Sequence, residues 1–437
     1  MKNKERKERE YGFETLALHG GSTVDPVTRS RAEPVHRTTS FLFDNAQHAT
    51  DLFDLKTPGY IYTRIGNPTQ EALERRLALL ENGTGALALA SGTAAVFYSV
   101  INLARQGDSI VSSDKLYGGT YTMFDKILPD YGIRTHFVKS LKPEDFAAAI
   151  DSTSKAVYVE TLGNPGLDLA DIPSIAKAAH EHSIPLIVDS TFTTPYLMKP
   201  LDLGADIVVH SITKWIGGHG TAIGGAVVES GKFDWAHGNF PMFTEPDASY
   251  HGLRWAYDLG DLSNQPFTTR MRTGALRNLG ASISPDNAWF FLQGIETLPL
   301  RMERHCQNAQ AAAEYLNRHP SVEWVRYPGL PEDPSHGLAQ KLLKKGFGGM
   351  VVFSLKGGRE SGASFIENLS LFSHLANVGD AKSLAIHPAS TTHSQLSEEQ
   401  QRASGVDPGM VRLSIGIEHI DDIIADLEAA LEAAGTV

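Results

Sequence analysis

The feature that most constrains the fold is an alternation of short apolar runs with amphipathic stretches between residues 63 and 297. Short apolar runs of this kind are typical of buried parallel strands, and the amphipathic stretches of the helices that connect them. The predicted strands are residues 86–90, 109–112, 156–160, 185–188 and 206–210, with 224–229 as a further one. Helices are predicted at residues 93–106 and 172–182, the second with Asp171 as its N-cap. The pattern therefore predicts an α/β fold with a large, doubly wound, mostly parallel sheet.

The regions on either side have different patterns. Residues 1–62 lack sustained periodicity and contain scattered prolines, which predicts an extended N-terminal arm with short helices. From residue 298 onward a long helix (298–318), two strands (349–355 and 411–417) and a closing helix from about Asp421 predict a smaller α+β domain. We therefore expect an arm (1–62), a large domain (63–297) and a C-terminal small domain (298–437).

One segment inside the large domain has no clear periodicity. Residues 233–262 are rich in aromatic residues, histidine and glycine. Long stretches without secondary structure are uncommon inside compact domains and are often functional. This segment is predicted to be a long functional loop or an insertion.

Composition narrows the functional class. The 437 residues include 39 basic and 51 acidic side chains, a formal charge of −12, which argues against nucleic acid as the main partner. The one cysteine, Cys306, excludes an internal disulfide and a cysteine-based zinc cluster. Residues 1–10 carry mixed charges, unlike a secretory signal, and no run approaches the roughly 20 apolar residues that span a bilayer. We expect a cytoplasmic protein with no membrane partner and no bound metal.

In a doubly wound sheet, ligands bind outside the carboxyl ends of the strands. After residues 86–90 come Ser91, Gly92 and Thr93, which open a helix. Glycine permits close backbone approach, and the free N–H groups of a first helical turn favour a phosphate. Taken alone, the same residues are more typical of an ordinary N-cap.

Two charged side chains follow other strands. Asp189 ends one strand, where a buried carboxylate needs a cation such as a protonated pyridine nitrogen, or else nearby hydroxyl and N–H groups. Lys214 follows the next strand; it could be an amine nucleophile or simply a solvated side chain. Ser211 and Thr213 would supply hydroxyls to an anion. An anion cradle, a carboxylate and a lysine on adjacent strand ends together indicate a pyridoxal 5'-phosphate (PLP) site.

Three further side chains have open alternatives. Asn164, in a Gly-Asn-Pro sequence, could bind the cofactor or a substrate carboxylate, or could only form a turn. Tyr117 could stack on a planar cofactor or belong to the core. Arg412 alternates with the apolar residues of its strand, so it points away from the apolar face and suits either a carboxylate clamp or a surface salt bridge.

With these residues in view, the sequence resembles the Cys/Met-metabolism family of PLP enzymes, which have the aminotransferase-like fold type I. The likeness covers nearly the whole chain from about Thr15. The motifs that carry it are residues 62–69 (YTRIGNPT), 91–95 (SGTAA), 117–120 (YGGT), 160–165 (ETLGNP), 188–191 (VDST), 211–215 (SITKW), 383–387 (SLAIH) and 411–419 (VRLSIGIEH).

The resemblance implies roles for single residues. Lys214 is implied to bind the PLP aldehyde as a Schiff base, and Asp189 to pair with the pyridinium nitrogen. Tyr117 is implied to stack on the ring, where it could assist proton transfer. The implied phosphate ligands within the subunit are Gly92, Thr93, Ser211 and Thr213. Many relatives have methionine in place of Thr93, but a backbone N–H contact does not depend on the side chain.

The resemblance also implies an assembly and a substrate site. Tyr62 and Arg64 are implied to reach the phosphate of a neighbouring subunit, which implies a homotetramer built from dimers with shared active sites. The residues implied to hold the substrate carboxylate are Asn164, Ser383 and Arg412.

Within the family, residues 233–262 resemble an insertion typical of the sulfhydrylases that act on O-acetylhomoserine. Methionine γ-lyases usually carry a cysteine where this chain has Gly119. The resemblance thus implies γ-replacement in methionine biosynthesis, in which O-acetylhomoserine and sulfide (or methanethiol) give homocysteine (or methionine) and acetate. Cystathionine γ-synthase and methionine γ-lyase activities remain alternatives within the family, and a non-catalytic αβ scaffold or nucleotide-binding module remains one outside it.

Overall fold

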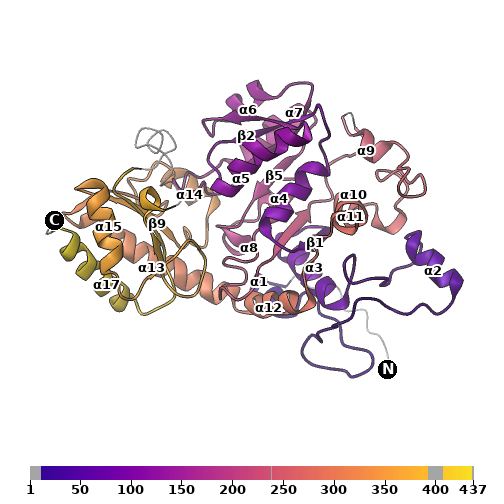
Figure 1. Ribbon diagram of the computed structural model, residues 1–437, viewed down its shortest axis with the longest axis horizontal. Helices are drawn as coiled ribbons and strands as arrows, with labels where there is room; N and C mark the ends of the chain where they lie inside the picture. Colours follow the sequence, from indigo (N-terminus) through magenta and orange to yellow (C-terminus); the bar gives the residue numbers. More distant parts are fainter. Residues whose placement is uncertain (1–10, 238, 392–406, 436–437) are drawn as a thin grey trace.

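The computed structural model describes residues 11–237, 239–391 and 407–435; the charged run at residues 1–10 lies outside them. A seven-stranded sheet forms the centre of the molecule, with strand order β1-β7-β6-β5-β4-β2-β3 (Figure 1). Its strands are β1 (Gly85–Leu89), β2 (Ser109–Ser113), β3 (Arg134–Val138), β4 (Ser154–Glu160), β5 (Leu186–Asp189), β6 (Ile207–His210) and β7 (Gly225–Glu229). All neighbouring pairs are parallel except those made by β7, which runs antiparallel to β1 and β6.

Both faces of this sheet are buried. Along β4, Val157 and Val159 pack into one apolar cluster, whereas Ala156 and Tyr158 pack into another on the opposite face. The first cluster includes residues of helices α3, α7 and α12, and the second includes residues of α4 and α10. Strands buried on both faces read as continuous apolar runs, which explains why the sequence predicted them.

Helices connect the strands and form the arm and the C-terminal region. Their bounds are α1 (Phe13–His19), α2 (Ala46–Phe53), α3 (Pro68–Glu81), α4 (Gly92–Ile101), α5 (Gly118–Thr122), α6 (Pro143–Ala149), α7 (Ile172–Glu181), α8 (Thr194–Leu197), α9 (Pro241–Thr244), α10 (Pro266–Met271), α11 (Arg277–Leu279), α12 (Pro285–Glu296), α13 (Leu298–Arg318), α14 (His336–Leu342), α15 (Gly358–Asn368) and α17 (Ile420–Ala434). The predicted long helix is α13, with the same bounds, and Asp171 caps α7 by accepting from the Ser174 amide.

Several details differ from the sequence prediction, among them the following two in the large domain; three of the five strands of the C-terminal sheet were not predicted either. Strand β3 was not predicted; it lies at the edge of the sheet, and four of its five residues are exposed or half-buried, so it lacks an apolar run. Helix α4 ends at Ile101 rather than at residue 106; Asn102 is its C-cap, and the Asn102 side chain donates to the Phe267 carbonyl at 3.0 Å.

The C-terminal region contains a second sheet of five strands, in the order β10-β11-β12-β9-β8. These strands are β8 (Val322–Arg326), β9 (Met350–Leu355), β10 (Ser373–His374), β11 (Leu384–Ile386) and β12 (Met410–Ser414). Helices α13, α15 and α17 pack with it around a separate apolar cluster, at the left of Figure 1. The exact domain boundaries stay a prediction.

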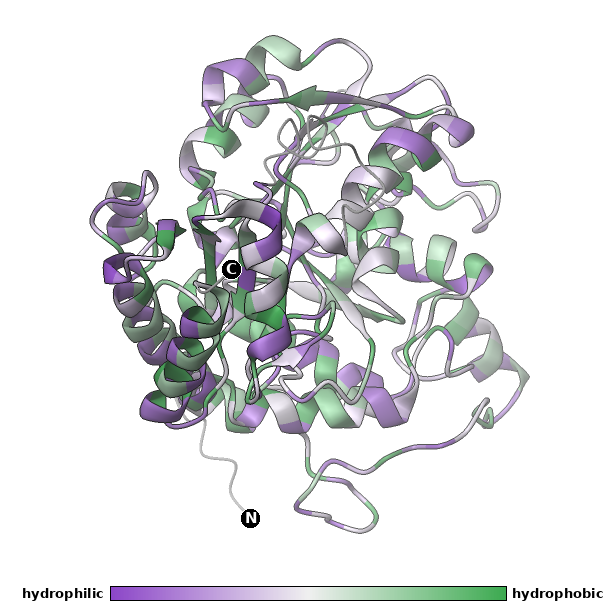
Figure 2. Ribbon diagram, turned by 60° about the vertical axis from the view of Figure 1, so that its left-hand side comes forward, coloured by the Kyte–Doolittle hydropathy of each residue, from purple (hydrophilic) through white to green (hydrophobic). Residues whose placement is uncertain are grey.

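The arm stands away from the rest of the molecule. After α1 the chain loops out from the body, reaches α2 at the far side and returns to α3 (Figures 1 and 2). Several of its apolar side chains are exposed, with Leu42 97% and Val27 87% accessible. Among the described helices, none combines the length and the apolar character needed to cross a membrane.

Candidate active site

The groups singled out in the sequence gather where the parallel strands of the large sheet end. This side of the sheet, at the carboxyl ends of those strands, is called the first edge below, and the side at their amino ends the opposite edge. Strands β1, β2, β4, β5 and β6 all point the same way, so their carboxyl ends share this edge. In the register of the sheet, Glu160 lies beside Asp189, and Asp189 beside Val209, one residue before the end of β6. The segments that contain Gly92, Tyr117, Asn164 and Lys214 leave the sheet from the same edge.

The predicted phosphate cradle is a close contact between two of these segments. A Cβ atom added to Gly92 would lie 2.6 Å from Cβ and 2.8 Å from Cα of Ser211, so only glycine fits. The first N–H groups of a helix have no partner inside the helix, and the Ser91 hydroxyl accepts only from the Ala94 amide. The amides of Gly92 and Thr93 therefore start a helix next to the Ser211 side chain, which is an arrangement that suits a phosphate.

Thr213 has a protein partner at this edge. Its hydroxyl donates to the Gly224 carbonyl at 3.1 Å and accepts from the Gly224 amide at 3.0 Å. The amide of Ser211 donates to the Thr191 hydroxyl at 2.8 Å. These bonds hold the turn that precedes Lys214, and the proposed contact of Thr213 with phosphate stays a prediction.

Lys214 lies on a tight turn that Arg301 supports. The Arg301 guanidinium, from α13, donates to the carbonyls of Trp215 (2.6 Å) and Ile216 (3.1 Å), and it is 5% exposed. The Lys214 amine donates to Asn377 Oδ1 at 2.5 Å. Burial lowers the pKa of Lys214, and the positive charge of Arg412 lowers it further. The turn thus presents an amine that gives up its proton more readily than an ordinary lysine.

Asp189 retains hydrogen-bonding capacity. Its Oδ1 accepts from the Thr191 amide at 2.9 Å, whereas its Oδ2 lies 3.4 Å from the Tyr158 hydroxyl. Burial raises the pKa of Asp189, against the hydrogen bonds from Thr191, which lower it. A carboxylate this buried gains stability from a further donor, and a cationic one would favour its charged form.

The backbone of Tyr117 is bound by the Glu160 carboxyl group. The Tyr117 amide donates to Glu160 Oε1 at 2.7 Å, and the ring remains 55% exposed at the edge. Burial and the neighbouring Asp189 carboxylate raise the pKa of Glu160 well above its usual range. A Cβ atom on Gly119 would lie 2.5 Å from the Tyr117 ring, so a cysteine there would require the ring to move.

Arg412 and Asn164 meet although they are far apart in the sequence. Arg412 Nη1 donates to Asn164 Oδ1 at 2.9 Å, which joins the second sheet to the end of β4. Burial lowers the pKa of Arg412 to about 10, so the guanidinium remains charged at neutral pH. The structure therefore brings a fixed cation close enough to Lys214 to affect its titration.

Ser383 differs from its neighbours in the predicted set. It is fully buried; its amide and hydroxyl donate to the two oxygens of Glu418 at 2.6 and 2.9 Å, and the hydroxyl accepts from the Gly416 amide. These partners occupy its polar groups, so its contact with a substrate stays a prediction. The side chain that reaches Lys214 from this region is Asn377, which the sequence analysis missed.

The loop that contains Asn377 is placed by a close approach of two backbones. Gly379 has a φ of +76°, and a Cβ atom there would lie 2.6 Å from the Trp215 amide nitrogen. The Ala381 amide also donates to the Gly218 carbonyl at 2.8 Å. In the sequence, Gly379 is the one local sign of a tight turn in this loop. Nothing near it in the sequence indicates that it approaches Trp215.

Tyr62 is the last residue of the arm and Arg64 lies just beyond it; both are exposed. The Arg64 guanidinium lies 4.9 Å from the centre of the Tyr62 ring. Among the described residues, no hydrogen bond or ion pair joins either side chain to the edge that contains Lys214. Their predicted role in a neighbouring subunit is untested.

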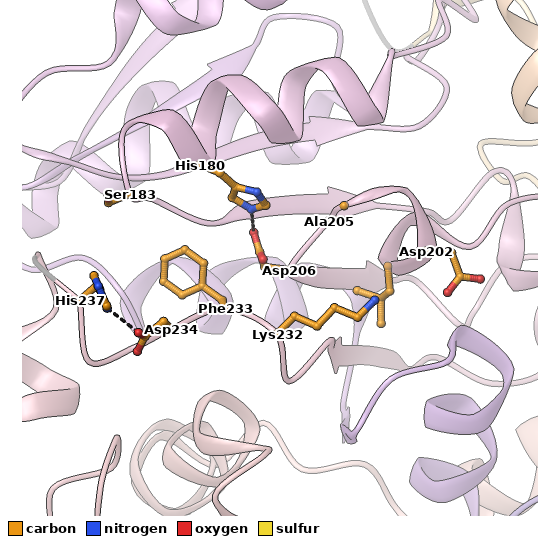
Figure 3. A pocket seen from close by; sticks show the side chains of 11 residues that line it. His180, Ser183, Asp202, Ala205, Asp206, Lys232, Phe233, Asp234 and His237 are labelled. Atoms are coloured by element: carbon orange, nitrogen blue, oxygen red, sulfur yellow. Dashed lines mark hydrogen bonds and ion pairs between the residues drawn. The ribbon is translucent and has the colours of Figure 1, made fainter.

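A cavity of about 410 Å³ lies at the opposite edge of the sheet (Figure 3). It is lined by Asp206, which precedes β6, and by Ser183, which precedes β5. His180 also lines it, and His180 Nε2 is bonded to Asp206 Oδ2 at 2.7 Å rather than paired with His182. None of the predicted site residues lines this cavity.

The residues at the first edge fit a PLP group. Asp189 Oδ2 offers an acceptor for a pyridinium N–H, the Gly92–Ser211 contact offers a phosphate cradle, and Lys214 offers an amine of lowered pKa. When bound, PLP acts as an electron sink for the carbon next to a substrate amine. The chemistry of this donor set thus agrees with that cofactor.

Comparisons with known proteins point the same way. Residues 14–432 match the model of the Cys/Met metabolism PLP-dependent enzymes. The chain is 52% identical to an O-acetyl-L-homoserine sulfhydrylase of Leptospira meyeri, covering 97% of each protein. It is 51% identical to a homocysteine synthase of Schizosaccharomyces pombe, covering 97% of this chain and 98% of that protein.

A solved structure supports the fold. A Campylobacter jejuni protein described as an O-acetylhomoserine (thiol)-lyase, whose structure contains a pyridoxyl-lysine monophosphate, superposes with a TM-score of 0.92. It is 42% identical, and the match covers 97% of this chain and 100% of that one. The predicted fold class is confirmed.

Proposed function

Because this chain belongs to the Cys/Met metabolism family of PLP-dependent enzymes, we propose that it joins sulfide or methanethiol to the four-carbon unit of O-acetylhomoserine. The products are homocysteine or methionine, and acetate. The full-length likeness to proteins named O-acetyl-L-homoserine sulfhydrylase and homocysteine synthase is the observation that carries the proposal.

The residues at the first edge have different roles in the proposed reaction. Lys214 holds the cofactor and, when free, moves protons at Cα and Cβ of the substrate; it can accept them only when neutral, which its lowered pKa favours. The Asp189 carboxylate binds the ring nitrogen and keeps it protonated. Gly92, Thr93 and Ser211 bind the phosphate, and Tyr117 covers the ring.

A second group orients the substrate. The Arg412 guanidinium, steadied by Asn164, binds the α-carboxylate in a two-pronged contact. With the carboxylate fixed, Cγ lies free for exchange of its substituent: the Cγ–O bond breaks to release acetate, and the Cγ–S bond forms with the incoming thiolate. Asn377 is added to the proposed site because it binds the Lys214 amine.

The assembly is part of the proposal. The exposed Tyr62 and Arg64, and the apolar side chains exposed along the arm, support a dimer in which each arm completes the partner's phosphate site, and a tetramer of two such dimers.

The proposed location is the cytoplasm. Cys306, the one cysteine, is buried, and burial raises the pKa of its thiol to about 11; such an inert thiol accords with that location.

The test is product analysis with O-acetylhomoserine and a choice of thiols. We expect homocysteine from sulfide and methionine from methanethiol, with acetate in equal amounts. The purified protein should be yellow, should be bleached by borohydride, and should be colourless as Lys214→Ala. Cystathionine as the main product in a mixture of sulfide and cysteine would instead indicate a cystathionine γ-synthase, and 2-oxobutanoate from methionine a γ-lyase.

A further inference from the structure

The insertion at residues 233–262 is anchored to the large sheet region by stacked aromatic rings. The Trp235 ring lies 4.5 Å from that of Phe243 and 5.4 Å from that of Phe267, which belongs to α10. The Arg270 guanidinium lies 5.4 Å from the centre of the Phe243 ring. This half of the insertion is therefore part of the core and does not hang free.

The other half is a tight turn built around Asp247. Its carboxylate accepts from the Ser249 amide at 2.9 Å and from Trp255 Nε1 at 3.0 Å, and its amide donates to the Leu253 carbonyl. Within this turn Tyr250 is only 7% exposed. The turn thus fixes the position of the Tyr250 ring.

Tyr250 binds the arm of its own chain. Its hydroxyl donates to the carbonyl of Phe53, the last residue of α2, at 2.8 Å. Carbonyls at the end of a helix have no partner inside it, so this bond caps α2. Leu55, just beyond α2, packs against the same apolar cluster as Tyr250. Leu52 is the one buried residue of α2, so these contacts are a large part of what holds the helix.

The arm around α2 is a long hairpin with two fixed ends. At its base the Phe41 amide donates to the Ile61 carbonyl at 3.2 Å and the Thr63 amide to the Thr39 carbonyl at 2.9 Å. Tyr62 lies in this base, opposite Ser40. At its tip is α2, which lies far from the C-terminal region and on the side of the molecule where α10 and α11 are found (Figure 1).

We propose that the insertion is a docking platform for α2, and that it holds the hairpin of residues 38–63 so that Tyr62 and Arg64 are oriented for the phosphate site of a second copy of this chain. Tyr250 is then a positioning residue, because it acts through the arm and touches no reacting atom. This inference rests on the proposed role of Tyr62 and Arg64.

The test uses Tyr250→Phe, which removes the hydroxyl but leaves the ring in place. Loss of one neutral hydrogen bond changes a local equilibrium by about two- to tenfold. We expect hydrogen exchange of residues 46–56 to be faster by about this factor, and the Kd of PLP for the apoenzyme to rise similarly. The matched control is Tyr257→Phe, because Tyr257 lies in the same insertion, is 51% exposed and contacts Arg254 of the insertion itself. Both measurements should then match the unmodified protein.

A double-mutant cycle separates positioning from general stability. If Tyr250 acts through the arm, Tyr250→Phe should no longer change the Kd of PLP in an Arg64→Ala background. Unchanged exchange in Tyr250→Phe, or faster exchange with an unchanged Kd, would overturn the proposal. The exchange and the Kd are measured without substrate, so an enzyme that made no homocysteine would refute the proposed function and leave this test intact.

Discussion

Buried carboxyl groups lie at both ends of the strands of the large sheet, but they differ in how close their hydrogen-bond donors lie. At the edge with Lys214, Asp189 has one close donor and one distant donor. At the opposite edge, Asp206 Oδ2 accepts from both His180 and the Leu186 amide, at 2.7 and 2.8 Å. There Glu229 accepts from two amides and a hydroxyl, supplied by Phe267 and Thr268.

This difference separates a structural carboxyl from a functional one. A buried polar group is costly unless it is hydrogen-bonded, so a fold that needs only stability provides all the partners itself. Asp189 Oδ2, whose donor is the Tyr158 hydroxyl at 3.4 Å, lies next to a glycine cradle and a lysine and has capacity left for a ligand. The comparison predicts opposite consequences for mutations at the two edges.

The largest effect is expected at Asp189. In Asp189→Asn the ring nitrogen loses its anionic partner, and kcat/KM should fall by roughly 100- to 1000-fold, as when one electrostatic contact to developing charge is removed. Asp206→Ala is the control at the opposite edge, where kcat/KM per folded enzyme should be unchanged. Steady-state kinetics with O-acetylhomoserine and sulfide measure both. A loss below tenfold in Asp189→Asn would remove the distinction between the edges.

The phosphate cradle should be sensitive to one added methyl group. In Gly92→Ala the new Cβ would overlap Ser211, and the Kd of PLP should rise roughly 10- to 100-fold, the equivalent of about 1–3 kcal/mol of overpacking. In Thr93→Ala the backbone is unchanged, so the Kd should stay within about twofold of the parent. Titration of the apoenzymes, followed by visible absorption, gives both values; equal effects would argue against backbone binding of the phosphate.

At the opposite edge the expected effect is on stability. Asp206→Ala leaves the Leu186 amide and the His180 ring without their acceptor, which should cost about 1–3 kcal/mol in the free energy of unfolding. Urea denaturation of the apoenzyme measures it. A marked loss of PLP affinity without a loss of stability would show that the cavity lined by Asp206 and His180 is energetically coupled to the active site.

An effect no larger than that of Asp206→Ala is expected in the pH dependence of stability. Burial raises the pKa of Glu229 to about 7, from an ordinary value of 4.5. The folded state therefore holds the proton more tightly than the unfolded one, and this contribution is full below about pH 4.5 and is lost as the pH rises through about 7. The unfolding free energy of the parent, relative to Glu229→Gln, should fall by on the order of 1–3 kcal/mol between pH 5 and pH 9. A flat difference would mean that Glu229 titrates normally.

Much of this site could be predicted because the sheet is buried on both faces. Apolar runs marked β1, β2, β4, β5, β6 and β7, and the residues after β1, β4, β5 and β6 were then candidates for the binding edge. Strand β3 escaped because it is a half-exposed edge strand. The partner of the Lys214 amine escaped because Asn377 is 163 residues away, and an asparagine in a loop has no local mark of its role.

Ser383 shows that a sequence motif does not predict which side chain of a segment faces the site. The motif at residues 383–387 lies just beyond the loop that reaches Lys214: Asn377 bonds to the amine and the Ala381 amide to the Gly218 carbonyl, and neither belongs to the motif. The structure places Ser383 against Glu418, where its hydroxyl and amide are both bonded.

The amino-acid sequence alone determined the order of the strands along the chain, and hence which polar residues stand at strand ends, because side-chain periodicity is a local property of the backbone. Only the tertiary structure decided which of those residues meet: Arg412 with Asn164, Asn377 with Lys214, and the insertion with α2. Each of these contacts joins segments more than 160 residues apart, and their positions depend on how the layers pack rather than on any local preference.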